Sequence, residues 1–284
     1  MKSALVADGE LLRRAVADAR RRNLTIGLVP TMGALHSGHT SLIDLARAET
    51  DFVVVSIFVN PTQFGPNEDF KRYPRPLEKD LKLCGEKGAD LVFAPEPATM
   101  YPPGFRSFVE VAELQDVLEG ASRPGHFRGV ATVVLKLFNL VQPDRAYFGQ
   151  KDAQQVRVLQ QMVRDLDVPV EMRIGPTVRE PDGLALSSRN QYLDANQRRQ
   201  APVLYQALRE AEALVRAGER DPSVVRQAFT DRIAAAPGTV LDYAAVVDAD
   251  TFATPVRLRG PTLLALAVKF GTTRLIDNLP VDAE

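Results

Sequence analysis

The chain has 284 residues, 45% of them hydrophobic, which is enough for about two domains with a core in each. Its 35 Lys and Arg residues against 36 Asp and Glu give a net charge of −1, so bulk basicity does not mark it as a nucleic-acid or membrane-surface binder. No segment approaches the roughly 20 apolar residues that span a bilayer, and Met1–Arg14 lacks a secretory signal. We therefore expect a cytoplasmic protein, with its single cysteine, Cys84, packed as a small hydrophobic residue.

Helices and strands are expected to alternate through the first part of the chain. Leu11, Leu12, Ala15, Val16 and Ala19 recur at helical spacing. After them we expect a strand at Leu24–Val29, a helix at Ser37–Glu49, a strand at Phe52–Val59, a helix at Leu77–Lys87, a strand at Asp90–Ala94, a helix at Val130–Val141, a strand at Arg145–Phe148, a helix from Val156 to Leu166 and a strand at Val170–Ile174. This alternation predicts an α/β domain over residues 1–176, with a Rossmann-like, doubly wound parallel sheet.

The pattern changes after Gly175. A turn at Pro181-Asp182-Gly183 leads into two helices, around Leu204–Val215 and Val225–Ile233. Short strands are then expected at Tyr243–Val247, Leu263–Val268 and Arg274–Ile276. We predict a smaller α+β C-terminal domain over residues 177–284.

Two of the three histidines, His36 and His39, lie in a glycine-broken segment directly after the first long strand. Such corners hold phosphates in α/β proteins, because free backbone N–H groups and the helix dipole both face the ligand. A zinc site needs three or four protein ligands, and the chain adds only His126 and Cys84 to the pair. Two merely packed histidines remain an alternative.

Three further segments carry candidate polar groups. Lys151 lies at a second strand-to-helix corner and could reach the same phosphates, or could be a solvated loop lysine followed by surface glutamines, Gln154 and Gln155. The loop Leu186–Asn190 could clamp a phosphate or simply cap a helix. Asn60 and Gln63 follow another strand, where amides suit a small polar substrate, although an ordinary Asn-Pro turn explains them too.

Taken together, these segments resemble the pantothenate synthetase family, the pantoate–β-alanine ligases of the nucleotidylyltransferase superfamily. The matching segments are Pro30–His39, Val55–Phe64, Tyr73-Pro74-Arg75, Leu118–Gly129, Leu137–Pro143, Phe148–Gln155, Asp182–Asn190 and Arg274–Asn278. The resemblance implies ATP-dependent condensation of pantoate with β-alanine through a pantoyl-adenylate, with release of pyrophosphate and AMP. It also implies ATP as a substrate, Mg²⁺ as a cofactor and a homodimer.

The resemblance assigns roles residue by residue. His39 would be the proton donor, with His36 and Lys151 acting on the phosphates. The ATP-binding residues would be Met32, Gly33, Ala34, Leu35, His36, Ser37, Gly38, His39, Gly149, Gln150, Lys151, Asp152, Val178, Leu186, Ser187, Ser188 and Arg189. Gln63 and Gln155 would bind pantoate, Gln63 and Asn60 would guide β-alanine, and Pro30, Met32 and Phe148 would line the pocket for pantoate's methyl groups.

Some points stay open at this level. Gln150 stands where the family commonly has Glu, which removes a carboxylate beside the triphosphate without touching Lys151 or Asp152. No metal ligand is identified; Asp80 is a possible contact, but a solvated helix carboxylate is the favoured interpretation. The alternatives are another adenylate-forming enzyme of the superfamily and a non-catalytic nucleotide sensor.

Overall fold

The computed structural model describes residues 3–66 and 68–284. The chain divides into two compact units, Met1–Pro176 and Thr177–Glu284. No helix in the described part of the chain is both long and apolar enough to cross a membrane.

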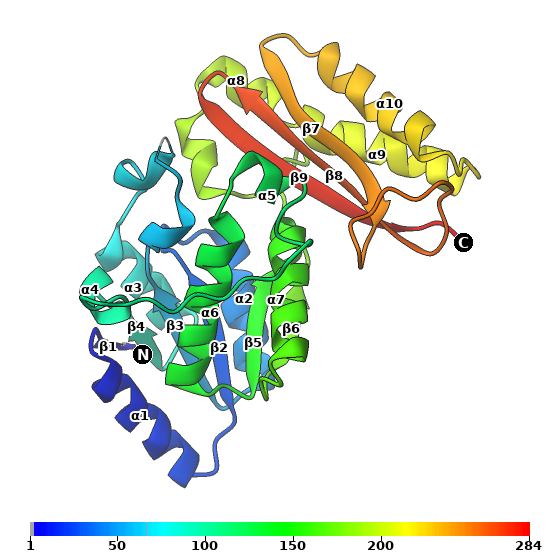
Figure 1. Cartoon of the computed structure of the whole chain (residues 1–284). Helices are drawn as coiled ribbons and strands as arrows, with labels where there is room; N and C mark the ends of the chain where they lie inside the picture. The colour runs from blue at the N-terminus through cyan, green and yellow to red at the C-terminus, as the bar shows by residue number, and fades with distance from the viewer. Residues whose placement is uncertain (1–2, 67) are drawn as a thin grey trace. The chain divides into compact units, whose positions relative to one another are not determined.

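The first unit is built on a six-stranded, all-parallel sheet with the strand order β1-β4-β3-β2-β5-β6 (Figure 1). Its strands are β1 (Ala4–Val6), β2 (Ile26–Thr31), β3 (Phe52–Ile57), β4 (Leu91–Phe93), β5 (Arg145–Gly149) and β6 (Glu171–Gly175). Its longer helices are α1 (Gly9–Arg21), α2 (Ser37–Glu49), α3 (Leu77–Glu86), α6 (His126–Val141) and α7 (Ala153–Asp165), with short helices α4 (Pro97–Met100) and α5 (Glu119–Ser122). The predicted doubly wound sheet is confirmed.

Successive residues of β3 explain why this strand is apolar at every position except Ser56. Val54 packs into a core shared with α1, α6 and α7, whereas Val53 and Val55 face the core shared with α2 and α3. Because helices cover both faces, apolar side chains are favoured on each of them. Cys84 lies fully buried in the second of these cores, and burial raises the pKa of its thiol to about 12, which confirms the packing role expected of it.

Several element boundaries differ from the sequence-based expectations. Strand β2 runs to Thr31 through Pro30, where the prediction stopped at Val29. Proline lacks the N–H for a ladder bond, but β5 pairs with β2 only at Gly27 and Leu28, so none is required there. Helix α6 begins at His126 rather than Val130, and the three-residue edge strand β1 was missed altogether.

The second unit packs helices on one small antiparallel sheet, as an α+β domain does. Strands β7 (Thr239–Asp248), β8 (Pro261–Phe270) and β9 (Thr273–Asp282) pair in sequence order. Helices α8 (Ala195–Gln200), α9 (Val203–Arg216) and α10 (Pro222–Ala234) precede them, and α9 and α10 share the core of this unit with the sheet. The strands are longer than predicted; Pro280 is tolerated inside β9 because β9 is an edge strand.

Candidate active site

The sheet topology gathers the predicted polar segments of the first unit. The chain runs from β2 outward through β3 to β4, then returns to place β5 on the other side of β2. Ligands bind in open α/β sheets at such a switch point, outside the carboxyl ends of the strands. The histidine segment follows β2, Asn60 and Gln63 follow β3, and Lys151 follows β5, so three neighbouring strand ends carry these groups.

His36 and His39 form a reciprocal cap at the start of α2. The Nδ1 atom of His36 accepts from the N–H of Gly38 at 3.2 Å, and the Nδ1 atom of His39 accepts from the N–H of His36 at 3.4 Å. An imidazole nitrogen that accepts carries no proton, so both rings are neutral with the proton on Nε2. The rings lie 4.1 Å apart between centroids, and each offers one N–H donor beyond the cap.

The electrostatics keep both imidazoles neutral. Burial, and next the charge of Lys151, lower the pKa of His36 to about 4. Burial, and next His36, lower the pKa of His39 to about 3. Lys151 lies at η3 (Gln150–Asp152), directly after β5, with its Nζ atom 3.4 Å from a carboxylate oxygen of Asp152. The fixed positive charge of this site is therefore the lysine, and the histidines supply uncharged donors.

Three backbone N–H groups of the histidine segment donate within the protein. Asp80, on α3, accepts from the N–H groups of Ala34 and Leu35 at 2.8 and 2.9 Å. The N–H of Gly33 donates to the hydroxyl of Thr31 at 3.1 Å. Asp80 is 1% exposed, so its interpretation as a solvated helix carboxylate was wrong. It holds the turn that presents the histidines, in which Gly33 and Ala34 both have positive φ.

Replacing Asp80 with asparagine is expected to weaken ATP use and stability together. An amide keeps one acceptor, so one of the two buried N–H groups of the turn would face an NH2 group, at a cost of about 1–3 kcal/mol. We expect a higher KM for ATP and a lower midpoint of thermal unfolding. Glu78→Gln, on the exposed side of the same helix, is the matched control and should change neither quantity.

Behind the predicted substrate amides lies a cluster that sequence reasoning missed. Two groups converge on the main-chain carbonyl of Gln63: the Nδ1 atom of His126 at 2.9 Å and the guanidinium of Arg123 at 3.3 Å. Arg123 also binds Glu68 through two 2.7 Å hydrogen bonds. Burial, then Arg123, lower the pKa of His126 to about 4, so this histidine too is neutral. The cluster fixes the backbone at Gln63, which is 8% exposed.

Two glutamines of α7 have different environments. Gln154 is 6% exposed and ties α7 to the segment before it, donating to the carbonyls of Leu114 and Val117 and accepting from the N–H of Glu119. Its interpretation as a surface residue was wrong. Gln155, the predicted pantoate contact, is partly buried.

The predicted pocket-lining residues of the first unit lie at the same strand ends. Pro30 is in β2 and Met32 directly follows it, and both are partly buried. Phe148, in β5, is 3% exposed.

Gly149 and Gln150 lie at the end of β5 and in η3, whereas Val178 and residues 186–189 belong to the second unit. Val178 and Leu186 are joined across a short hairpin by a hydrogen bond between the N–H of Leu186 and the carbonyl of Val178 at 3.0 Å. Ser187 caps η4 (Ser188–Tyr192) by accepting from the N–H of Arg189, so the capping interpretation of this loop is correct. Capping uses an oxygen lone pair of Ser187 and leaves its hydroxyl proton for another acceptor.

The described residues contain no group of three His, Cys, Asp or Glu side chains that could hold a metal ion. Each carboxylate oxygen of Asp80 accepts one hydrogen bond from the turn of Ala34 and Leu35. Mg²⁺ usually keeps several waters and binds through one or two carboxylates plus substrate phosphates. The described residues therefore do not form a protein cage for such an ion.

Acid pH is expected to destabilise the first unit through its histidines. All three have folded-state pKa values of about 3 to 4, below their usual 6.5, so the unfolded chain binds more protons between these limits. The contribution of these histidines to the free energy of unfolding is fully present above pH 6.5. It is lost as the pH falls, by at most about 1.4 kcal/mol for each pH unit and each histidine. Urea unfolding at pH 7, 6 and 5 measures this slope; His126→Gln should reduce it, and an unchanged slope would contradict the assignment.

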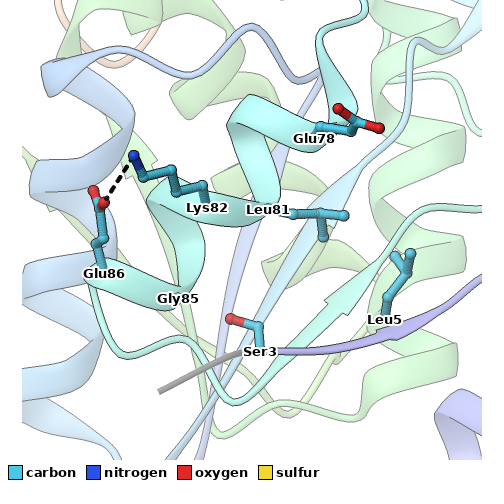
Figure 2. Close-up of a pocket in the computed structure, with 7 residues that line it drawn as sticks. All are labelled: Ser3, Leu5, Glu78, Leu81, Lys82, Gly85 and Glu86. Atoms are coloured by element: carbon cyan, nitrogen blue, oxygen red, sulfur yellow. Dashed lines mark ion pairs between the residues drawn. The ribbon is translucent and has the colours of Figure 1, made fainter.

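A separate pocket lies beside α3 and the edge strand β1 (Figure 2). Its lining residues are Ser3, Leu5, Glu78, Leu81, Lys82, Gly85 and Glu86. The one ion pair drawn there joins Lys82 to Glu86 at 3.8 Å, along the helix. None of the predicted ATP or substrate residues lines it, so we do not assign it to the active site.

Comparison with known proteins identifies the family of this chain. The sequence profile described as pantoate-β-alanine ligase matches residues 4–280. Pantothenate synthetase from Moorella thermoacetica is 59% identical over 271 residues, covering 95% of this chain and 96% of the relative. The corresponding protein of Thermotoga neapolitana is 54% identical over 269 residues, with the same coverage of both chains.

Solved structures extend the comparison. The crystal structure of pantothenate synthetase from Thermus thermophilus superposes with a TM-score of 0.93 at 48% identity, covering 97% of this chain and 98% of that one. The ligase from Francisella tularensis, crystallised with β-γ ATP and β-alanine, gives a TM-score of 0.81 at 35% identity, covering 98% and 97%. Because the profile and these relatives match nearly the whole length of the chain, the chain belongs to the pantoate-β-alanine ligase family.

Proposed function

We propose that the protein condenses pantoate with β-alanine at the expense of ATP, through a pantoyl-adenylate. The observation that carries this proposal is that hydrogen-bond donors suited to an anion and an amide suited to a second substrate lie together at the ends of β2, β3 and β5. His36, His39 and Lys151 suit phosphates, whereas Gln63 suits a carboxylate or hydroxyl. A nucleotide sensor needs the first set but has no use for a second substrate.

The chemistry follows from these groups. A carboxylate is a poor acyl donor, so a carboxylate oxygen of pantoate first attacks the α-phosphorus of ATP, and pyrophosphate leaves. The Nε2–H groups of the histidines and the ammonium of Lys151 face the charge that builds up on the phosphate oxygens. Because both histidines are neutral, His39 acts through a donated hydrogen bond, and Lys151 carries the positive charge.

The second step forms the amide. The unprotonated amine of β-alanine attacks the acyl carbon of the mixed anhydride, AMP leaves, and the nitrogen loses a proton to solvent. Positioning is the main contribution of the protein here, because no covalent enzyme intermediate is required. Within this proposal, Mg²⁺ would neutralise charge on the triphosphate, and Val178 and Leu186–Arg189 keep the ATP-binding roles that the resemblance implies.

Other features of the enzyme belong to the same proposal. Gln155 and Asn60 retain their predicted substrate roles, with Pro30, Met32 and Phe148 beside pantoate's methyl groups. Residues 1–176 would be the domain that binds ATP and pantoate, and residues 177–284 the lid domain. We also propose a cytoplasmic homodimer.

One experiment tests the reaction. Purified protein is incubated with ATP, Mg²⁺ and labelled pyrophosphate, with and without pantoate. We expect exchange of label into ATP only when pantoate is present, and release of AMP once β-alanine is added. Exchange that depends on a different acid would indicate another adenylate-forming enzyme, and ATP binding without turnover would indicate a sensor.

A further inference from the structure

The hydrogen bonds around Asn60 determine which way its side-chain amide points. Asn60 is 1% exposed. Its Nδ2 atom donates to the main-chain carbonyl of Gly129 at 3.1 Å, a group that can only accept. Its Oδ1 atom accepts from the main-chain N–H of Thr62 at 3.3 Å, a group that can only donate. In the flipped amide, the NH2 group would face the N–H of Thr62 and the oxygen would face the carbonyl of Gly129, so neither hydrogen bond could form.

The backbone approach that makes this possible depends on a glycine. A Cβ atom at position 129 would lie 2.4 Å from the carbonyl oxygen of Thr62 and 2.7 Å from the Cα atom of Gln63. Any larger residue there would push α6 away from η1 (Pro61–Gln63). The absence of a side chain at Gly129 therefore lets the main-chain carbonyl of α6 reach Asn60.

The orientation of Asn60 in turn determines that of Gln63. The Nδ2 atom of Asn60 also donates to the Oε1 atom of Gln63 at 3.0 Å. The Nε2 atom of Gln63 then lies on the other side, 3.1 Å from the sulfur of Met32. A thioether is a weak acceptor, so a carboxylate is the stronger partner for this NH2 group. Gln63 offers a ligand a donor and keeps its oxygen for the protein.

Tyr101, directly after α4, makes the shortest contact with this pair of amides. Its hydroxyl donates to the Oδ1 atom of Asn60 at 2.8 Å and lies 3.3 Å from the hydroxyl of Thr62. The ring packs edge-on against Phe105, with 5.0 Å between centroids. Tyr101 is not among the residues predicted to bind ATP or a substrate.

We propose that Tyr101 is a positioning residue that holds Asn60, and through it Gln63, so that the NH2 group of Gln63 meets the carboxylate substrate. The inference rests on the proposed function, because pantoate is the substrate whose carboxylate it concerns. Tyr101 acts through two amides and does not touch the reacting atoms itself.

A double-mutant cycle of Tyr101 and Gln63 tests whether Tyr101 acts through Gln63. Tyr101→Phe removes only the hydroxyl, and we expect it to raise the KM for pantoate roughly five- to tenfold, the effect of one lost hydrogen bond, with the KM for ATP nearly unchanged. In a Gln63→Ala background the same substitution should change the pantoate KM by less than about twofold, because nothing remains to be positioned. Tyr147→Phe, which removes a buried hydroxyl bonded to Glu49 instead, is the control and should leave the pantoate KM unchanged.

A second variant tests the direction of the amide without relying on Tyr101. Gln63→Glu keeps an oxygen for Asn60 but replaces the donor with an acceptor, so it should weaken pantoate use more than Gln63→Ala does. Equal effects of Tyr101→Phe in both backgrounds, or better pantoate binding by Gln63→Glu than by Gln63→Ala, would overturn the inference while leaving the reaction intact. Absence of pantoate-dependent exchange in the unaltered protein would instead overturn the proposed function.

Discussion

Replacing His39 with alanine is expected to lower pantoate-dependent ATP–pyrophosphate exchange by about a hundredfold or more, the loss typical of one preorganised donor. The Nδ1 atom of His39 is held by the N–H of His36, so its Nε2–H is the group directed elsewhere. Because burial keeps the ring neutral, with a pKa of about 3, the lost interaction is a hydrogen bond rather than an ion pair. Initial exchange rates at saturating pantoate and ATP measure the effect.

Two amide replacements separate the roles of the two ring nitrogens. The NH2 group of glutamine reaches the position of Nε2, whereas asparagine ends near Nδ1. His39→Gln should therefore recover more exchange activity than His39→Asn, while His39→Asn should preserve the helix cap better. A His39→Ala variant with near wild-type exchange, or an asparagine variant more active than the glutamine one, would contradict the donor role.

The periodic parts of this fold could be predicted because their signals are local. The apolar run after Phe52 indicates a strand covered on both faces, and the histidine segment after β2 indicates a ligand corner. The placement of Lys151 near His36 follows from the topology of a doubly wound sheet, which brings β5 beside β2. Pattern and fold class together were sufficient for the strand and for the proximity of these segments, while the ligand at this corner stays a prediction.

Asp80 and Tyr101 could not be predicted in the same way. Asp80 contacts Ala34 across 46 positions of sequence, and Tyr101 contacts Asn60 across 41. Neither spacing repeats a helical or strand period, and Asp is mostly exposed in proteins while Tyr is intermediate, so residue type gives no signal for either contact. Only the packing of α3 beside α2, and of the segment after α4 beside η1, reveals that Asp80 contacts the histidine turn and that Tyr101 contacts Asn60.

The largest expected effect on stability concerns the second unit, where Arg179 and Asp277 form a buried bidentate pair. Their two hydrogen bonds measure 2.6 and 2.9 Å, and their side chains are 15% and 2% exposed. The guanidinium also stacks on Tyr205 at 3.9 Å and binds the carbonyl of Gly183. This pair anchors the hairpin of Val178 and Leu186 to strand β9.

Asp277→Ala should lower the free energy of unfolding of the second unit by about 3–5 kcal/mol, since it leaves a guanidinium buried without its partner. Glu210→Ala removes the half-exposed partner of Arg232 in the same unit and should cost at most about 1 kcal/mol. The chain has no tryptophan, so urea unfolding is followed by far-ultraviolet circular dichroism. The double replacement Arg179→Met with Asp277→Leu should recover part of the loss, because it leaves no uncompensated charge. Equal losses in Asp277→Ala and Glu210→Ala would mean that the buried pair does not anchor the hairpin.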